Sequence, residues 1–474
     1  MGKHDEATGG GARSLDGAVA PTRQARSALT RARILDAAQA AFVEQGIAAV
    51  SLRDVAERAS LSHPGVLRHY ASLDALLGAV VERLDDANAD WIEHEPVPVG
   101  TLGAAALARR NAAAPGYLEL FTALSGEATS RSHPAHDMMR ARYARVRASI
   151  ADELVARAAV AASDASWSAT LLIAGWDGLQ VQQRYAPDSI DLVGELEARE
   201  RRLMGAPART PSSDTARPGG PGGPTGPGAR TAPEGAGGML APTVLLEQPE
   251  PPGAGGGTAT GAGAGAQQRP AASARGARRH EAIVEAATEL FARDGFTGTS
   301  LAAIAGRTGI SKATLLHHIG SKAELLTEVL RHRDRLTITG GAPARGGATD
   351  RLRSLPATAE RTAAAHPGLV ELYAVLSCEG ATPGHPAHEY FAHRFRETRR
   401  YFASLLQGAR DEGSLAPDRD PGSEAAWLLA VWDGLQIQSL YDPAVEVARL
   451  LRRHLDDLLG PVEGRAPRDI PSAV

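Results

Sequence analysis

A stretch of 27 residues occurs twice in this chain, and each copy has the pattern of two short helices joined by a tight turn. In the second copy, Ser300–Leu326, apolar residues return at the spacing of one helix face. Gly309 can adopt the left-handed backbone that ends a helix, and Ser311 is placed to cap the helix that follows. The outer face of this second helix is polar. The pattern predicts a helix-turn-helix, in which the second helix enters the major groove of DNA.

The first copy, Ser51–Leu77, lies 249 residues upstream, and the repeat extends well beyond this motif. The tetrad HPAH that starts at His133 returns at His385, and the pentad WDGLQ that starts at Trp176 returns at Trp432. Both halves are rich in alanine, and no stretch alternates convincingly between apolar and polar residues. We therefore predict an all-α protein made of two copies of one two-part unit.

Stretches rich in proline, glycine and alanine separate and flank the two units. Such sequence cannot bury enough apolar surface to order itself, so we predict a disordered linker and tails. A flexible linker of this length has an end-to-end distance on the order of 45 Å. We expect each unit to have an N-terminal head, which carries the helix-turn-helix, and a C-terminal helical body. The predicted order is tail 1–22, head 23–92, body 93–204, linker 205–272, head 273–339, body 340–461 and tail 462–474.

Composition and local motifs argue against several classes of protein. No apolar run approaches the roughly 20 residues that span a bilayer, and the N-terminus lacks the apolar core of a secretory signal. The single cysteine, Cys378, excludes an internal disulfide and fits a reducing cytoplasm. P-loop, GxSxG and HExxH motifs are missing. We therefore expect a cytoplasmic protein that is not an enzyme and has no cofactor and no membrane partner.

The charge balance differs between the two heads. The net charge of −4 decides little, because a sequence-specific DNA binder needs only a local basic surface. Residues 23–86 contain eight Lys and Arg against eight Asp and Glu, whereas residues 273–336 contain ten against seven. The second head is therefore predicted to be the better DNA binder.

Both helix-turn-helix segments resemble those of the TetR family of transcriptional regulators. The segment GISKATLLHHIGSKAELL of the second head is closely similar, and SLSHPGVLRHYASLDALL of the first head is more loosely similar. The repeated HPAH and WDGLQ segments also resemble those of many family members. The resemblance implies three N-terminal helices that bind DNA and a helical body for ligand binding and dimerisation. Because one chain carries two units, it also implies an intrachain pseudo-dimer, and pairing of two whole chains as a homodimer stays open.

Outward side chains of the second helix in each motif, about Ser62–Tyr70 and Ser311–Ile319, can donate hydrogen bonds to phosphates or base edges. The alternative is that they are only solvated. The predicted DNA-binding residues are Ser62, His63, Gly65, Arg68, His69 and Tyr70 in the first head, and Ser311, Lys312, Thr314, His317, His318 and Lys322 in the second. The first head departs from the family pattern, since Leu73 and Gly65 stand where the second has Lys322 and Thr314. We expect it to bind more weakly or to read a different half-site.

Aromatic and polar residues within the bodies are candidates for an effector pocket, although helix packing explains most of them equally well. The predicted effector residues are Tyr117, Phe121, His136, Trp176, Gln180, Tyr373, His388, Trp432 and Gln436. The HPAH tetrads place two histidines on one helix face, a spacing that can hold a metal. The proline, however, marks a helix start, and no third ligand recurs with them, so no metal site is predicted.

These features predict a sequence-specific DNA-binding transcriptional regulator, and the family resemblance implies a repressor that a small molecule releases from DNA. Its predicted partners are a double-stranded DNA operator and a small, largely apolar effector ligand. Effector binding in the bodies would change the separation or angle of the heads and so lower DNA affinity. The alternative is a ligand sensor or protein-interaction scaffold whose degenerate first head no longer binds DNA.

Overall fold

The computed structural model describes residues 22–95, 101–157, 159–205, 269–339, 346–365, 368–382 and 384–460. All named elements within these ranges are helices, and an isolated bridge joins Leu415 to Leu459. The predicted all-α fold is therefore confirmed. The predicted tails and linker lie outside the described residues, apart from a few residues at their edges.

The N-terminal unit, called unit 1, has a head and a body that follow one another along the chain. The helices of head 1 are α1 (Arg23–Gln45), η1 (Ile47–Ala49), α2 (Leu52–Arg58), α3 (His63–Leu67) and α4 (Leu73–His94). The helices of body 1 are α5 (Ala104–Ala113), α6 (Tyr117–Glu127), α7 (His136–Ala156), α8 (Ala162–Tyr185) and α9 (Leu192–Leu203).

Unit 2 repeats this order. The helices of head 2 are α10 (Arg269–Gly298), α11 (Leu301–Thr308), α12 (Lys312–Ile319) and α13 (Lys322–Thr339). The helices of body 2 are α14 (Ala348–Ala365), α15 (Leu369–Glu379), α16 (His388–Asp411), α17 (Pro421–Tyr441) and α18 (Val447–Leu458). The backbone of α10 leaves the helical region at Gly295, where φ is 70°. This kink corresponds to the break between α1 and η1, where Gly46 has φ 81°.

Serine caps determine where the helices of both heads begin. In each case the hydroxyl oxygen accepts a hydrogen bond from a backbone N–H three residues later, which satisfies a group that the helix itself cannot. The capping serines are Ser51, Ser62 and Ser72 in head 1 and Ser300, Ser311 and Ser321 in head 2. Gly309 ends α11 with a left-handed φ of 67°. The predicted turn and the predicted cap at Ser311 are both confirmed.

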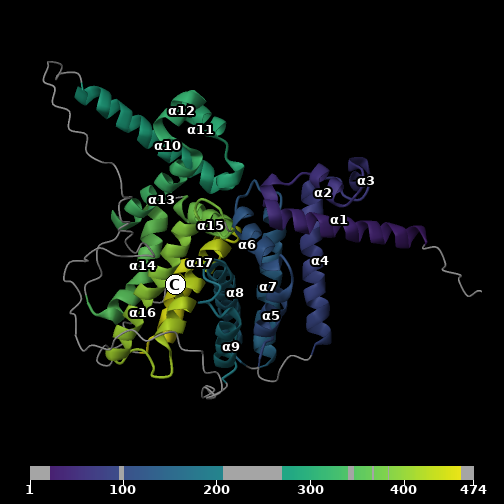
Figure 1. Ribbon diagram of the computed structural model, residues 1–474. Coiled ribbons are helices and arrows are strands. Elements are labelled where there is room, and N and C mark those ends of the chain that lie inside the picture. Colours follow the sequence, from purple (N-terminus) through teal and green to yellow (C-terminus); the bar gives the residue numbers. More distant parts are fainter. Residues whose placement is uncertain are drawn as a thin grey trace, which may run out of the picture.

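The two bodies pack against each other along α8 and α17, which lie side by side near the centre of the molecule (Figure 1). At Gly178 and Gly434 the helices approach so closely that a Cβ atom would collide with the backbone of the other helix, at Ala430 and Ala174 respectively. Only glycine permits this approach. A single buried core therefore continues from one body into the other.

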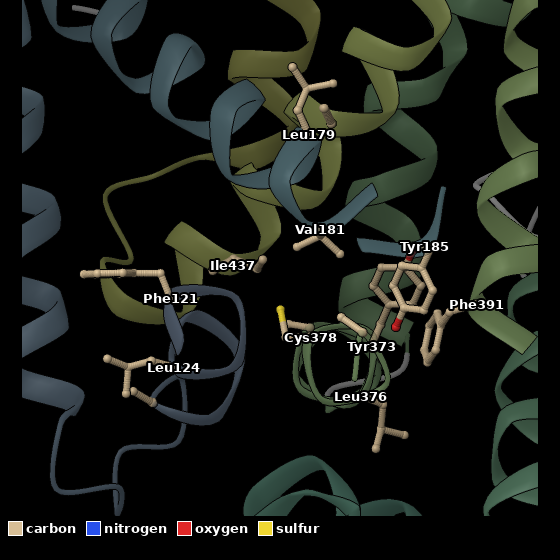
Figure 2. Packing of buried hydrophobic residues seen from close by; sticks show 14 of the residues in the cluster. Phe121, Leu124, Leu179, Val181, Tyr185, Tyr373, Leu376, Cys378, Phe391 and Ile437 are labelled. Carbon is tan, nitrogen blue, oxygen red and sulfur yellow. The ribbon is translucent and has the colours of Figure 1, made fainter. Parts of the chain in front are cut away.

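Aromatic residues extend this contact around the ends of α8 and α17. Tyr185 at the end of α8 lies next to Phe391 of α16, with ring centroids 6.0 Å apart (Figure 2). Its hydroxyl donates a hydrogen bond of 2.5 Å to the carbonyl of Ser377 in α15. Tyr441 at the end of α17 donates in the same way to the carbonyl of Ser125 in α6, at 2.9 Å. The contact is thus closely two-fold in character.

The heads occupy one end of the molecule. Figure 1 shows both above the bodies, with α1 and α10 extending in opposite directions. The last helix of each head continues down along its own body, where ion pairs hold it. Arg142 of α7 pairs with Asp85 of α4 at 2.9 Å, and Arg394 of α16 pairs with Asp334 of α13 at 3.4 Å. An ion pair therefore ties each head to its own body.

Candidate functional sites

The second helix of the motif in head 2, α12, presents polar groups on its outer face. Leu315 and Ile319 are buried and hold the helix against the rest of the head. Lys312 and His317 are exposed, whereas Thr314 and His318 are half-buried. The hydroxyl of the capping Ser311 lies 2.8 Å from that of Thr314, so these two groups are already engaged with each other. The side chains freest to meet DNA are therefore those of Lys312 and His317.

Lys322 lies apart from this polar face. Its ammonium group sits 4.3 Å from the ring centroid of Phe296, which follows the kink in α10. Burial lowers the pKa of Lys322, and the negative charge of Glu379 partly offsets this effect. Lys322 thus lies at the junction between head 2 and body 2.

The corresponding helix of head 1 is shorter than predicted. The expected helix over Ser62–Tyr70 is wrong at its C-terminal end, because α3 ends at Leu67 and a turn follows. Pro64 and Gly65 are both poor helix formers, which explains the shortening. Gly65 is buried, so it forms no part of an outer surface, whereas Arg68 is exposed. His63, His69 and Tyr70 are half-buried, and Ser62 uses its hydroxyl as the cap.

Glu379, the last residue of α15, connects body 2 to head 2. Its two carboxylate oxygens accept hydrogen bonds of 2.6 Å from the backbone N–H groups of Phe296 and Thr297. The imidazole of His385 lies 3.8 Å away. In unit 1 the equivalent residue is Glu127, whose carboxylate accepts no hydrogen bond from the described residues of head 1. Burial and the charge of Glu379 raise the pKa of Glu127 to about 8.

Two clefts separate the units near this junction. One has a volume of about 400 Å³ and is lined by residues of both heads and both bodies, including Leu73, Glu127, Thr297 and Glu379. The other, of about 450 Å³, is lined in part by Arg131, Glu289 and Arg293. None of the nine predicted effector residues lines either cleft.

Each body instead encloses a buried polar cluster around the aspartate of its WDGLQ pentad. In body 2, neither carboxylate oxygen of Asp433 has a hydrogen-bond partner among the described residues, and the hydroxyl of Tyr373 has none either. Burial raises the pKa of Asp433 to about 7, although Arg394 and Arg333 act in the opposite direction. In body 1, burial likewise raises the pKa of Asp177 to about 7. Groups with unmet hydrogen bonds in a protein interior are candidates for binding a ligand or ordered water.

Several other predicted effector residues lie in the same two bodies. Trp432 is fully buried and the indole of Trp176 partly so, and neither indole N–H has a hydrogen-bond partner among the described residues. Gln180 is buried and Gln436 is half-buried. The guanidinium of Arg142 lies over the ring of Phe121, 4.5 Å from its centroid. The hydroxyl of the nearby Tyr117 accepts a hydrogen bond of 3.2 Å from Asn88. Phe121 and Tyr373 occupy equivalent positions in the two bodies, each beside an arginine.

His136 and His388 lie elsewhere, in the contact between the bodies. The imidazole of His136 stacks on Tyr441 of unit 2 at 5.4 Å, and that of His388 stacks on Tyr185 of unit 1 at 5.1 Å. Each also forms a hydrogen bond of 2.9 Å with a carbonyl group of its own unit. Packing between the units therefore accounts for the second histidine of each HPAH tetrad.

Three features of these sites were not predicted from the sequence. It singled out the tryptophan and glutamine of WDGLQ, whereas the glycine permits the approach of α8 and α17 and the aspartate forms the polar cluster. The repetition of the whole pentad was the signal available for both. Nothing in the local sequence of Glu379 indicates its bonds to head 2, because its partners lie 82 and 83 residues away.

No described helix is both long and apolar enough to cross a membrane. Among the same residues, no three His, Cys, Asp or Glu side chains are grouped so as to hold a metal ion.

Comparison with known proteins supports a common origin of the two units. A sequence profile described as bacterial regulatory proteins of the tetR family matches residues 34–80 and residues 283–329. A profile described as the C-terminal part of BetI-type transcriptional repressors matches residues 385–460. The profiles therefore fall on both heads and on the larger part of body 2.

Individual relatives resemble single units. An HTH-type transcriptional repressor of Mycobacterium tuberculosis is 47% identical over 53 residues, which cover 11% of this chain and 28% of that repressor. The chain thus spans little more than a quarter of that relative's length. The HTH-type transcriptional regulator TtgR of Pseudomonas putida is 28% identical over 192 residues, 35% of this chain and 86% of TtgR. A solved TetR-family regulator from Agrobacterium tumefaciens is 18% identical, covering 39% of this chain and 100% of that one, with a TM-score of 0.35.

Proposed function

This chain belongs to the TetR family of bacterial regulatory proteins, of which it carries two units in tandem, and we propose that it is a DNA-binding transcriptional regulator. The observation that carries the proposal is the presence of two helix-turn-helix heads, each matched to the family, at one end of the molecule. Heads placed in this way can meet one face of a DNA duplex together.

Each head would place its second helix in a major groove. In head 2, Lys312 and His317 are exposed on α12 and would donate to phosphates or base edges. In head 1, Arg68 is an exposed cation directly after α3. Since α3 is short and Gly65 is buried, we expect head 1 to contribute less affinity than head 2. The preferred operator would then have two unlike half-sites.

The two units would act as an intrachain pseudo-dimer. Support comes from the close approach of α8 and α17 at Gly178 and Gly434, and from the matched hydrogen bonds of Tyr185 and Tyr441. A single chain would then present both heads, about 34–36 Å apart on DNA if the half-sites lie one helical turn apart.

A small effector would release the protein from DNA, as expected of a repressor. We assign its site to the clusters at Asp433 and Asp177, where acceptors such as the carboxylate of Asp433 and donors such as Nε of Arg394 both lack partners among the described residues, which favours a polar effector that donates and accepts hydrogen bonds. This differs from the largely apolar effector expected from the sequence. An effector beside Asp433 would also disturb Arg394, which pairs with Asp334 on α13, the last helix of head 2. Couplings of this kind are typically about 1–3 kcal/mol.

The test is selection of bound sequences from a random DNA pool by the purified full-length chain, with its solution mass recorded alongside. Enrichment of one site with two unlike half-sites, by a monomer, is the expected result. A perfect palindrome bound by a dimer of chains would contradict the pseudo-dimer but keep the regulator. No enrichment of any sequence would contradict DNA recognition and favour the scaffold with a degenerate first head.

A further inference from the structure

Several aromatic and backbone contacts between the bodies are two-fold symmetric and therefore do not distinguish unit 1 from unit 2. The stack of His136 on Tyr441 is matched by that of His388 on Tyr185. The approach at Gly178 is matched by the approach at Gly434. Two copies of unit 1, or two copies of unit 2, could form each of these contacts with themselves. Symmetric contacts therefore supply affinity without specificity.

One group of buried charges lies on one side of this interface and lacks a symmetric counterpart. The carboxylate of Glu424, near the start of α17, is fully buried. It accepts hydrogen bonds of 2.7 Å from Arg199 and from Arg202, both on α9 of unit 1. Arg419 of its own unit lies 3.4 Å away. Burial by itself would raise the pKa of Glu424, but these arginines hold it below its ordinary value.

The equivalent residues in the other unit have different chemistry. The WDGLQ repeat aligns α8 with α17 and places Ser168 at the position of Glu424. Helices α9 and α18 are both 12 residues long, and their alignment places His454 at Arg199 and Asp457 at Arg202. Burial lowers the pKa of His454 to about 4, so it carries no charge near neutral pH.

Homotypic pairs would therefore contain poorly compensated charge. In a pair of unit 2 copies, each Glu424 would keep Arg419 of its own unit but would face His454 and the carboxylate of Asp457 in place of two arginines. In a pair of unit 1 copies, Arg199 would keep Glu195 of its own unit but would face the hydroxyl of Ser168 in place of Glu424. A second contact has the same one-sided character, since Ser423 donates to Glu195 at 2.7 Å and its equivalent in unit 1 is Trp167. Removing one partner of a buried ion pair is strongly unfavourable, whereas the intact pair adds little affinity.

We infer that the charge cluster of Glu424 with Arg199 and Arg202 makes unit 1 the specific partner of unit 2 and excludes pairing of like units. This inference rests on the intrachain pairing proposed above and adds the reason why that pairing outcompetes the alternatives. Specificity here comes from penalties on the wrong pairs rather than from extra affinity in the right one. The duplicated chain would thereby avoid cross-linking into larger assemblies through like units.

The experiment uses the full-length chain with a protease site introduced within residues 206–268. The folded chain is cleaved, and preparations of natural and heavy isotopic composition are mixed and warmed until light and heavy fragments have exchanged. Native mass spectrometry then counts the three kinds of pair. The expected result is pairs of one N-terminal with one C-terminal fragment, including mixed light–heavy pairs, with homotypic pairs at about 1% or less.

Two other outcomes would overturn the inference, and they are distinguishable. Homotypic and heterotypic pairs in random proportion would show that the bodies pair without the specificity inferred here, and would leave the pseudo-dimer of the intact chain standing. Separation of the cleaved chain into single fragments would contradict the pairing itself, and with it the pseudo-dimer of the proposed function.

A matched pair of variants tests the assignment to Glu424. Glu424→Ser introduces the residue of unit 1, and we expect the ratio of heterotypic to homotypic pairs to fall by at least about tenfold. Glu446→Ser removes an exposed carboxylate of the same unit and should leave the ratio unchanged. An unchanged ratio in Glu424→Ser would assign the specificity to other residues and overturn the inference. Circular dichroism checks that both variants are folded. If Glu424→Ser does not fold, the proportions of pairs measured for the cleaved chain without substitutions decide the question.

Discussion

The carboxylate of Glu379 in body 2 accepts a hydrogen bond of 2.6 Å from the backbone N–H of Phe296 in head 2, and its second oxygen accepts one from Thr297. Glu127, the equivalent residue of unit 1, forms no such bond to a described residue of head 1. Two units with the same order of helices thus hold their heads differently. Head 2 therefore has a hydrogen-bonded link to its body that head 1 lacks among the described residues, so the two heads are expected to respond unequally to an effector.

Replacing Glu379 should loosen the turn at which head 2 meets its body. In Glu379→Ala we expect the amide hydrogens of Phe296 and Thr297 to exchange about 10- to 100-fold faster, because a hydrogen bond to a charged group contributes about 1.5–3 kcal/mol. Hydrogen exchange followed by mass spectrometry or NMR measures this. Glu127→Ala is the matched control and should leave exchange in head 1 unchanged. Unchanged exchange in Glu379→Ala would show that its bonds do not stabilise the turn.

Stability should depend on pH through Asp433. Its pKa is raised from 3.8 to about 7 in the folded chain, so the native state keeps a proton that the unfolded chain has already released. The stabilisation of the native state by this proton is complete below about pH 4, decreases as the pH rises towards 7, and is lost above pH 7. Between pH 5 and 8 the loss is on the order of 2–3 kcal/mol.

Denaturant unfolding of the full-length chain at several pH values tests this expectation. Asp433→Asn should flatten the slope of stability against pH relative to the natural chain, while the exposed Asp418→Asn should leave the slope as it is. Asp177 and Glu127 act in the same direction, so part of the slope will remain in Asp433→Asn. An unaltered slope in that variant would mean that Asp433 is ionised in the folded chain.

Adding one methyl group at Gly178 should disrupt the contact between the bodies. In Gly178→Ala the new Cβ atom would collide with the carbonyl of Ala430, so we expect a loss of stability of about 3 kcal/mol or more. Gly306→Ala makes the same change on an exposed helix with nothing nearby, and should stabilise the protein by about 0.5–1 kcal/mol. Thermal unfolding compares the two. Equal melting temperatures would contradict the close approach of α8 and α17.

Head 2 should dominate DNA binding. We expect Lys312→Ala with Thr314→Ala to weaken operator binding about tenfold or more and to reduce its salt dependence, since each lost phosphate contact lowers the slope by about 0.9. Arg68→Ala with His69→Ala in head 1 should cost less. Arg449→Ala removes an exposed cation from α18 and serves as the control. Operator affinities of the variants are measured at several salt concentrations. A larger loss of affinity in the head 1 variant than in the head 2 variant would contradict the prediction.

Local signals were sufficient to predict the architecture of the heads. Serine caps, glycine stops and the spacing of apolar residues act within a few positions along the chain, so α11 and α12 were predicted nearly to the residue. The same reasoning overestimated α3, because Pro64 and Gly65 weaken a helix by amounts that a pattern of apolar residues does not register. For the bodies, the repeat predicted that the WDGLQ pentads matter, but not which of their residues carry the contact.

The sequence by itself determined the duplication, the helical fold and the polar outer face of each second helix, because each depends on neighbours within one or two helical turns. Only the tertiary structure decided which buried charges face each other. Arg199 and Glu424 are 225 residues apart, and Glu379 and Phe296 are 83 apart. Such pairs depend on how helices from two units pack, and the free energy of a buried charge depends on what packing places beside it.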